Sequence, residues 1–191
     1  WGGWWPTHIL FENNYMHDGQ IYASHNGGPF SWRTSGMTAV RNTLDNYGFG
    51  GLGRIAGDSH LELNYVNNAN YGWDTAGIQM NQSIDSVNVQ RNWIFNTQRN
   101  GIRSDGHPGG IGKIVTHNVV MGNGTGIKLK GDQHKVHHNL GFNNGADIGM
   151  WLSKFYGYTR ATDSTLQDLV KAEKYQNNAY DNIKVTEGFE I

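Results

Sequence analysis

Four charged residues in a repeated local pattern could perform acid–base chemistry on an anionic ligand. Arg103 and Asp105 follow one Gly-Ile step, and Lys128 and Lys130 occupy the same places after the next one. Neighbouring cations repel each other, which favours a neutral amine and makes Lys128 or Lys130 a candidate general base. The planar fork of Arg103 suits a carboxylate or a sulfate. The alternative is an ordinary charged surface, with Asp105 and Lys130 paired across neighbouring strands.

A repeated frame would have to position these residues, because they lie one full repeat apart. The frame is an apolar residue followed three positions later by Asn, and its intervals mostly lie between 21 and 28 residues. A repeat of this length with variable insertions is typical of stacked coils. The framed residues are Asn14, Asn42, Asn64, Asn92, Asn118, Asn139 and Asn178.

A second polar row and an Ile position follow in the same register. Four residues after each framed Asn comes Asp or Asn, except at Gly122. The second row consists of Asp18, Asn46, Asn68, Asn96, Asn143 and Asn182. The later Ile positions are Ile21, Ile78, Ile102, Ile127 and Ile148, and in the second coil both Leu52 and Ile55 fit.

These rows predict a parallel β-helix, in which each strand pairs with its counterpart about 4.8 Å away on the next coil. Ile and Val would fill the core, and Asn would occupy the corners because it tolerates left-handed backbone and can bond the Asn above it. We predict an all-β, single-stranded, right-handed parallel β-helix of about six to seven coils, forming one domain over residues 1–191. A capping box and helical spacing predict one short helix near 164–174.

The Asn and Gly-Ile ladders resemble the right-handed parallel β-helix proteins of the pectate-lyase-like superfamily, with PbH1-type repeats. The resemblance covers nearly the whole chain and is carried by the rows given above. That superfamily includes polysaccharide lyases, glycoside hydrolases, epimerases, tailspikes and non-catalytic surface proteins. Lysine and arginine serve as base and acid in several of its lyases. The resemblance therefore implies polysaccharide as the ligand class, and it assigns no residue through a family motif.

Strand alternation predicts which residues near the Ile positions point outward. The two outward columns are Gln79, Arg103, Lys128 and Gly149, and then Asn81, Asp105, Lys130 and Trp151. We expect these columns to form a polar wall facing water, with Arg103 close to Lys128 and Asp105 close to Lys130. Gln79 and Asn81 would position a substrate on this wall.

Aromatic residues outside the Ile and Val core form a second group of candidate substrate-binding residues. Tyr22, Trp73 and Trp151 fall in loops or at outward positions. Flat rings beside polar groups form a suitable surface for the faces of sugars. We predict that these three residues, together with His107, contact the substrate.

A pair of carboxylates would indicate glycoside hydrolysis instead of elimination. Asp58, Asp74 and Asp105 would converge if Asp58 occupies the place of Asp105 on its own coil. A solvated Asp at a turn is the simpler explanation of each. This second chemistry depends on a loop and a coil that the sequence does not place.

The nine histidines raise the question of a metal site. His137 and His138 are adjacent, so on a strand they should point to opposite faces, whereas His117 and His138 should stack on neighbouring coils. No HExxH or comparable spacing occurs, and we predict no metal site. Asp and Asn oxygens would suit Ca²⁺, but no loop motif indicates it, and we predict no cofactor.

The composition excludes several partners. The chain has 15 Lys and Arg against 16 Asp and Glu, which favours neither a nucleic acid nor a membrane. No cysteine is present for a disulfide, and no apolar run could span a bilayer. The chain opens with aromatic residues, at Trp1, Trp4 and Trp5. We expect a mature or excised segment of a larger protein, with further coils or chains stacking on its open ends.

Three functions remain open from the sequence. The first is a carbohydrate-active protein, extracellular or at the cell surface, that acts on an acidic polysaccharide by lyase-type β-elimination. The second is a non-catalytic module that binds glycan through its aromatic loops. The third is a structural segment of a fibre, adhesin or tailspike.

Overall fold

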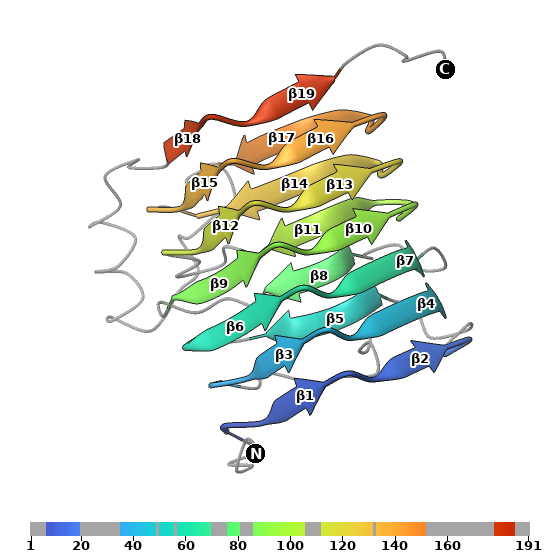
Figure 1. Cartoon of the computed structure of the whole chain (residues 1–191). Coiled ribbons are helices and arrows are strands. Elements are labelled where there is room, and N and C mark those ends of the chain that lie inside the picture. The colour runs from blue at the N-terminus through green and yellow to red at the C-terminus, as the bar shows by residue number, and fades with distance from the viewer. Residues whose placement is uncertain are drawn as a thin grey trace, which may run out of the picture.

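The described strands form three parallel stacks (Figure 1). The computed structural model describes residues 7–19, 35–48, 50–55, 57–69, 76–80, 86–105, 112–131, 133–151 and 178–185. These residues form nineteen strands, and among them no helix is long and apolar enough to cross a membrane. The described chain is therefore an all-β parallel solenoid, as predicted.

Each stack is one sheet, and its members come from successive coils. The first sheet contains β1 (Leu10–Glu12), β3 (Thr38–Val40), β6 (Ser59–Glu62), β9 (Val87–Gln90), β12 (Ile114–Thr116), β15 (Lys135–His137) and β18 (Asn178–Tyr180). The second contains β2 (Tyr15–His17), β4 (Thr43–Tyr47), β7 (Tyr65–Ala69), β10 (Trp93–Phe95), β13 (Val119–Met121), β16 (Leu140–Phe142) and β19 (Ile183–Val185). The third contains β5 (Gly50–Ile55), β8 (Ala76–Met80), β11 (Asn100–Ser104), β14 (Thr125–Lys130) and β17 (Ala146–Trp151).

The path of the chain has the predicted hand. It crosses the front of Figure 1 from left to right, returns behind from right to left and rises with each coil, which is a right-handed course. Five coils contain a strand of every sheet, whereas the two terminal coils contain only β1 with β2 and β18 with β19 among the described residues. The prediction of six to seven coils holds only if these incomplete coils are counted. The helix predicted near 164–174 lies outside the described residues.

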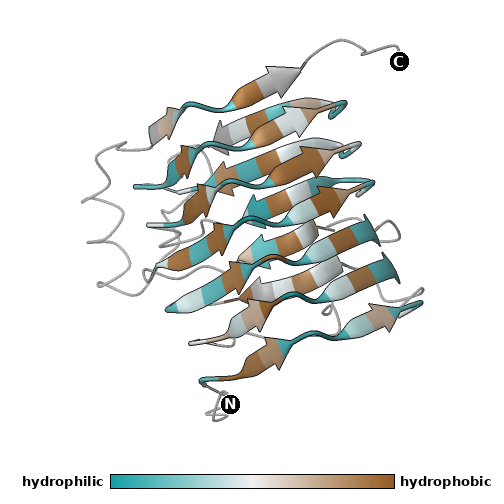
Figure 2. Cartoon of the chain, viewed as in Figure 1, coloured by the Kyte–Doolittle hydropathy of each residue, from teal (hydrophilic) through white to brown (hydrophobic). Residues whose placement is uncertain are grey.

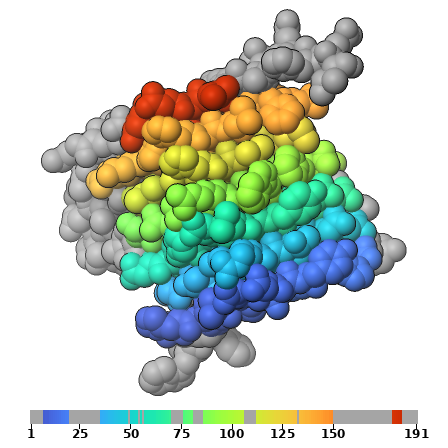
Figure 3. Space-filling model, viewed as in Figure 1, coloured from blue at the N-terminus to red at the C-terminus, as the bar shows by residue number. Residues whose placement is uncertain are grey.

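Apolar side chains stack in columns inside the coils, and brown bands recur from strand to strand in Figure 2. Ile102 pairs in register with Ile78, and both are fully buried. One coil earlier Leu52 pairs with Ile78, while Ile55 pairs with Met80 beyond an irregularity in the register. Leu52 therefore holds the Ile position of that coil. In the space-filling view each coil forms one band of colour directly above the band before it (Figure 3).

The first Asn row forms a continuous ladder along one corner, as predicted. Asn92 donates its backbone N–H and one side-chain N–H to Oδ1 of Asn118, both over 3.0 Å. Its side chain also donates to the carbonyl of Leu61, and its own Oδ1 accepts two bonds from Asn64. The same pattern joins the coils from Asn14 to Asn182. The ladder thus satisfies polar groups that are buried away from water.

The backbone of this corner differs from the expected one. The residue before the ladder Asn is left-handed, with φ of 54° at Arg91 and 57° at His117. The prediction that the framed Asn itself takes this conformation was wrong, because its side chain must point inward to reach the next coil. The second polar row does take it, with φ of 57° at Asn46 and 53° at Asn96, and Gly122 at the exception has φ of 68°.

The last framed position was placed wrongly at Asn178. Asn178 lies on β18 and pairs with Lys135, whereas Asn182 accepts the backbone N–H of Asn139 over 3.1 Å. Asn182 also fits the spacing of the second row. The sequence therefore allowed the ladder position of this coil to be assigned to Asn178, four residues too early.

Glycine precedes the Ile position because neighbouring coils approach closely there. A Cβ added to Gly101 would lie 2.6 Å from the carbonyl oxygen of Gly126, and one added to Gly126 would lie 2.7 Å from that of Asp147. Asp147 holds the equivalent place on β17, above which no described strand of the third sheet stacks. The column of glycines therefore ends where the sheet ends.

Candidate functional site

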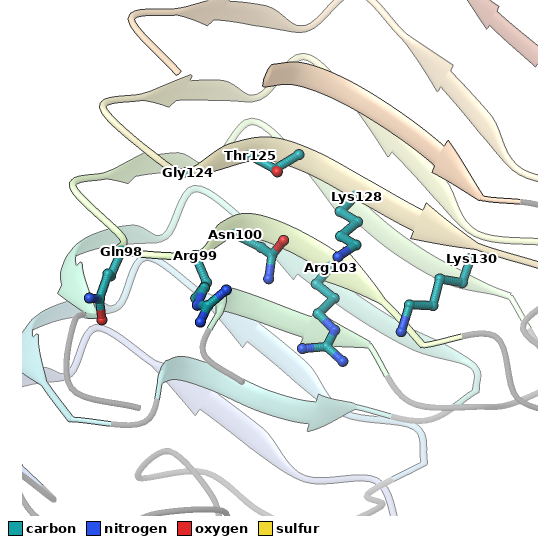
Figure 4. A pocket seen from close by; sticks show the side chains of 8 residues that line it. All are labelled: Gln98, Arg99, Asn100, Arg103, Gly124, Thr125, Lys128 and Lys130. Atoms are coloured by element: carbon teal, nitrogen blue, oxygen red, sulfur yellow. The ribbon is translucent and has the colours of Figure 1, made fainter. Parts of the chain in front are cut away.

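The register of the third sheet brings the predicted charged residues together. Arg103 on β11 pairs with Gln79 on β8 and with Lys128 on β14, and Lys128 pairs with Gly149. This is the first outward column predicted from the sequence. Figure 4 shows the side chains of Arg103, Lys128 and Lys130 projecting from the neighbouring strands β11 and β14.

Asp105 is the centre of the polar network. Its Oδ1 accepts from Nε of Arg103 over 2.9 Å, lies 2.7 Å from Nη2 of Arg103 and lies 3.3 Å from Nζ of Lys130. Its Oδ2 accepts from Nε2 of Gln79 over 2.9 Å. The expected contact between Asp105 and Lys130 is confirmed, and Asp105 also holds the guanidinium of Arg103 in one orientation.

The expectation that this wall faces water was wrong for two of its members. Gln79 is 5% exposed and Arg103 is 6% exposed. Strand alternation gives the side on which a residue lies, but both sides of β8 and β11 are buried. Charges in such a place interact more strongly than they would on an open surface.

The carboxyl group of Asp105 remains ionised despite this burial. Burial by itself raises the pKa of Asp105, but the charge of Arg103, its hydrogen bond and the charge of Lys130 together lower the pKa below its usual value. Asp105 is therefore a permanent counter-ion near neutral pH and a poor general acid.

An open pocket of about 340 Å³ lies beside this network (Figure 4). It contains four cationic side chains, two amides and a hydroxyl group. The lining residues are Gln98, Arg99, Asn100, Arg103, Gly124, Thr125, Lys128 and Lys130. Such a lining suits an anionic ligand that also carries hydroxyl groups.

Five of the eight lining residues were not anticipated from the sequence. Gln98, Arg99 and Asn100 lie at and just before the start of β11, and their turn is held by a second ladder. Asn123 Oδ1 accepts from both the backbone N–H and the hydroxyl of Thr97, over 2.9 and 2.8 Å. Thr97 directly precedes Gln98, so this buried contact fixes the wall of the pocket. The sequence feature that could have indicated this contact is Asn123, which follows Gly122, the one position of the second polar row that is neither Asp nor Asn.

Several predicted site residues are not placed. Tyr22, Trp73, Asn81 and His107 lie outside the described residues. The backbone of Trp151 pairs with that of Lys130 at the end of β17.

The carboxylate cluster proposed for glycoside hydrolysis does not form from Asp58 and Asp105. Asp58 is an exposed, left-handed residue just before β6, and its N–H bonds the carbonyl of Ser86. Asp105 follows β11, and its N–H bonds the carbonyl of Met80. Both residues therefore lie between a strand of the third sheet and a strand of the first sheet, but Asp105 directly follows its strand, whereas Asp58 directly precedes the next one. Asp58 does not occupy the place of Asp105 on its own coil, and the two coils are not neighbours. Asp74 lies outside the described residues.

The histidines form a column on another corner. His117 and His138 stack with ring centres 5.0 Å apart, as expected. His137 and His138 do not point to opposite faces, because His138 is left-handed, and their Nδ1 atoms are 2.8 Å apart. Within the part of the chain that the structure describes, no group of three His, Cys, Asp or Glu residues could hold a metal ion.

This column gives the fold a dependence on pH. Burial lowers the pKa of His137, and the nearby His138 and His117 lower it further. The unfolded chain then binds more protons, so stability is full above about pH 6.5 and falls as the pH drops below that value. We expect the free energy of unfolding, measured by urea titration, to decrease over this range. In His137→Gln the slope should become shallower, and an unchanged slope would contradict this assignment.

Comparison with known proteins gives no match to a family model, a curated protein or a solved structure. The fold itself defines the class, which is a parallel β-solenoid with a cationic pocket on its third sheet. Membership in the pectate-lyase-like superfamily stays a prediction.

Proposed function

We propose that this protein binds an acidic polysaccharide of the extracellular space or cell surface in the pocket on the third sheet. The observation that carries the proposal is that four cations, Arg99, Arg103, Lys128 and Lys130, line one pocket, while Asp105 pairs with two of them, Arg103 and Lys130. Uronate or sulfate groups would meet the cations, and sugar hydroxyls would meet Asn100 and Thr125. The resemblance to pectate-lyase-like proteins supports the same ligand class.

The chemistry that fits this lining is β-elimination of a uronate polymer. A base removes the proton on the carbon next to the carboxylate, a carbon–carbon double bond forms, and the glycosidic bond at the following carbon breaks. The leaving oxygen then takes a proton. In this proposal Lys128 in its neutral form is the base, with Lys130 as the alternative, and Arg103 neutralises the uronate carboxylate. Gln79 and Asn81 position the substrate, and Tyr22, Trp73, Trp151 and His107 contact neighbouring sugars.

The pocket cations should control affinity. We expect Lys128→Gln to weaken binding of polygalacturonate or alginate oligosaccharides about tenfold, because one charge-assisted contact is lost. Isothermal titration calorimetry at low salt measures the change. Lys135→Gln is the matched control, since Lys135 is an exposed lysine on β15 of the first sheet, and it should bind within about twofold of the wild type. Equal losses in both variants would mean that binding is not localised to the pocket.

A panel of uronate polymers separates catalysis from binding. Incubation that produces ultraviolet absorbance of an unsaturated product supports elimination. Retention on an immobilised polymer without that product supports the non-catalytic module. No product and no retention with any acidic polymer would overturn the proposed function.

One observation favours the non-catalytic alternative. Tyr65 and Trp93 pair in register on the second sheet, and Tyr15 lies in the same row two coils earlier. Their exposed fractions are 66% for Tyr15, 39% for Tyr65 and 42% for Trp93. Exposed rings in one row offer a surface for contact with a glycan or another chain, on a different sheet from the charged pocket.

A further inference from the structure

His134 is a fully buried histidine that lies between the candidate pocket and the first sheet. Its Nδ1 accepts the backbone N–H of Lys113 over 3.2 Å, and its Nε2 lies 2.9 Å from the carbonyl oxygen of Lys130. A nitrogen that accepts an N–H carries no proton, so the proton of the neutral ring is on Nε2. His134 therefore donates to Lys130 and is fixed in one tautomer.

This bond reaches the pocket through the backbone of Lys130. Lys130 is the last residue of β14, and the chain turns directly after it at Gly131, which has φ of 109°. The ammonium group of Lys130 lies 3.3 Å from Oδ1 of Asp105 and lines the pocket. A donor held at the carbonyl of this terminal residue fixes the direction in which its side chain leaves the strand.

We propose that His134 is a positioning residue that holds Lys130 against Asp105 and so shapes the anion-binding pocket. The part of this inference that concerns the ligand rests on the proposed function. The part that concerns the pairing of Lys130 with Asp105 does not depend on any ligand.

Two amide substitutions separate the roles of the two ring nitrogens. In His134→Gln the side-chain amide reaches about as far as Nε2 and can still donate to Lys130. In His134→Asn the amide reaches only about as far as Nδ1, so it can accept from Lys113 but cannot donate to Lys130. Positioning of Lys130 should survive in the Gln variant and fail in the Asn variant.

The readout that needs no ligand is the titration of the Asp105 carboxyl group, followed by NMR in the full chain. In Lys130→Met the pKa of Asp105 should rise, because one neighbouring cation is removed. We expect His134→Asn to raise it in the same direction, while His134→Gln leaves it close to the wild-type value. Val136→Ala is the control for general loss of stability, since it removes buried apolar volume near His134 without touching Asp105.

The outcomes distinguish this inference from the function on which it builds. An Asp105 pKa that is unchanged in His134→Asn, or that moves as much in Val136→Ala, would overturn the positioning role. If His134→Asn does not fold, the Gln variant decides: a raised pKa of Asp105 there would reject the role of the Nε2 donor.

Binding of polygalacturonate oligosaccharides then tests the connection to the pocket. We expect about tenfold weaker binding in His134→Asn and binding within about threefold of wild type in His134→Gln. A wild-type protein that binds no acidic oligosaccharide would overturn the proposed function, while the titration of Asp105 would still test His134. Binding by the wild type with equal affinity in the Asn variant would reject His134 alone.

Discussion

Replacing Asp105 with Asn is expected to lower the free energy of unfolding by about 3 kcal/mol, because removing one partner of a buried ion pair leaves an uncompensated charge. The substitution keeps the shape of the side chain and removes the charge that faces Arg103 and Lys130. The side chain of Arg103 is only 8% exposed, so water replaces the lost carboxylate only in small part. Urea denaturation at neutral pH, followed by circular dichroism, measures the loss.

Asp58→Asn is the matched control for this result. Asp58 is exposed at a corner before β6, so its substitution should change stability by less than about 0.5 kcal/mol. Adding Lys130→Met to Asp105→Asn should recover part of the loss, because one of the two cations that faced the carboxylate is removed as well. A small loss in Asp105→Asn, or full additivity with Lys130→Met, would show that these charges are not coupled.

Replacing Asn92 with Ala should destabilise the fold by about 4 kcal/mol. Asn92 is fully buried, and its side chain takes part in bonds to Asn64, Leu61, Gln90 and Asn118. The substitution removes the acceptor of two buried N–H groups of Asn64 and the donor to the carbonyl of Leu61, while Asn118 keeps only the backbone N–H of residue 92. Each buried polar group left without a partner costs about 1–3 kcal/mol. Thermal and urea unfolding both measure this change.

Asn14→Ala tests whether position in the ladder matters. Asn14 is exposed at the first described coil, and its side chain donates to Asn42 and to the nearby carbonyl of Glu12. We expect a loss below about 1 kcal/mol, because water can satisfy what remains. If Asn14→Ala and Asn92→Ala are equally costly, burial is not the source of the ladder's contribution.

The fold could be predicted because its periodic contacts are made by particular residue types. A buried side-chain amide that bonds its counterpart on the next coil requires Asn at a fixed place, and close backbone approach requires Gly, as at Gly101 and Gly126. Because these requirements recur, Asn and Gly appear at fixed positions of successive coils. At the last coil the pattern was ambiguous, because Asn178 and Asn182 both fit a polar row.

The site was harder to predict because it depends on features without a period. The pairing of Arg103 with Lys128 followed from register, but the burial of Arg103 did not, since alternation says nothing about what covers a face. Arg99 lies in a turn, and its place in the pocket wall depends on the contact between Thr97 and Asn123. His137 and His138 were expected to diverge, and the left-handed backbone of His138 brings them together.

The Asn ladder also gives the solenoid a dipole along its axis. From Asn42 to Asn182 each side-chain oxygen accepts from the Asn of the preceding coil, so the side-chain carbonyl dipoles point the same way and add instead of cancelling. The second side-chain N–H of these residues bonds a backbone carbonyl of the preceding coil. The summed dipole places partial negative charge at the end near Asn14 and partial positive charge at the end near Asn182. A negatively charged group is therefore favoured beside the last coil and disfavoured beside the first.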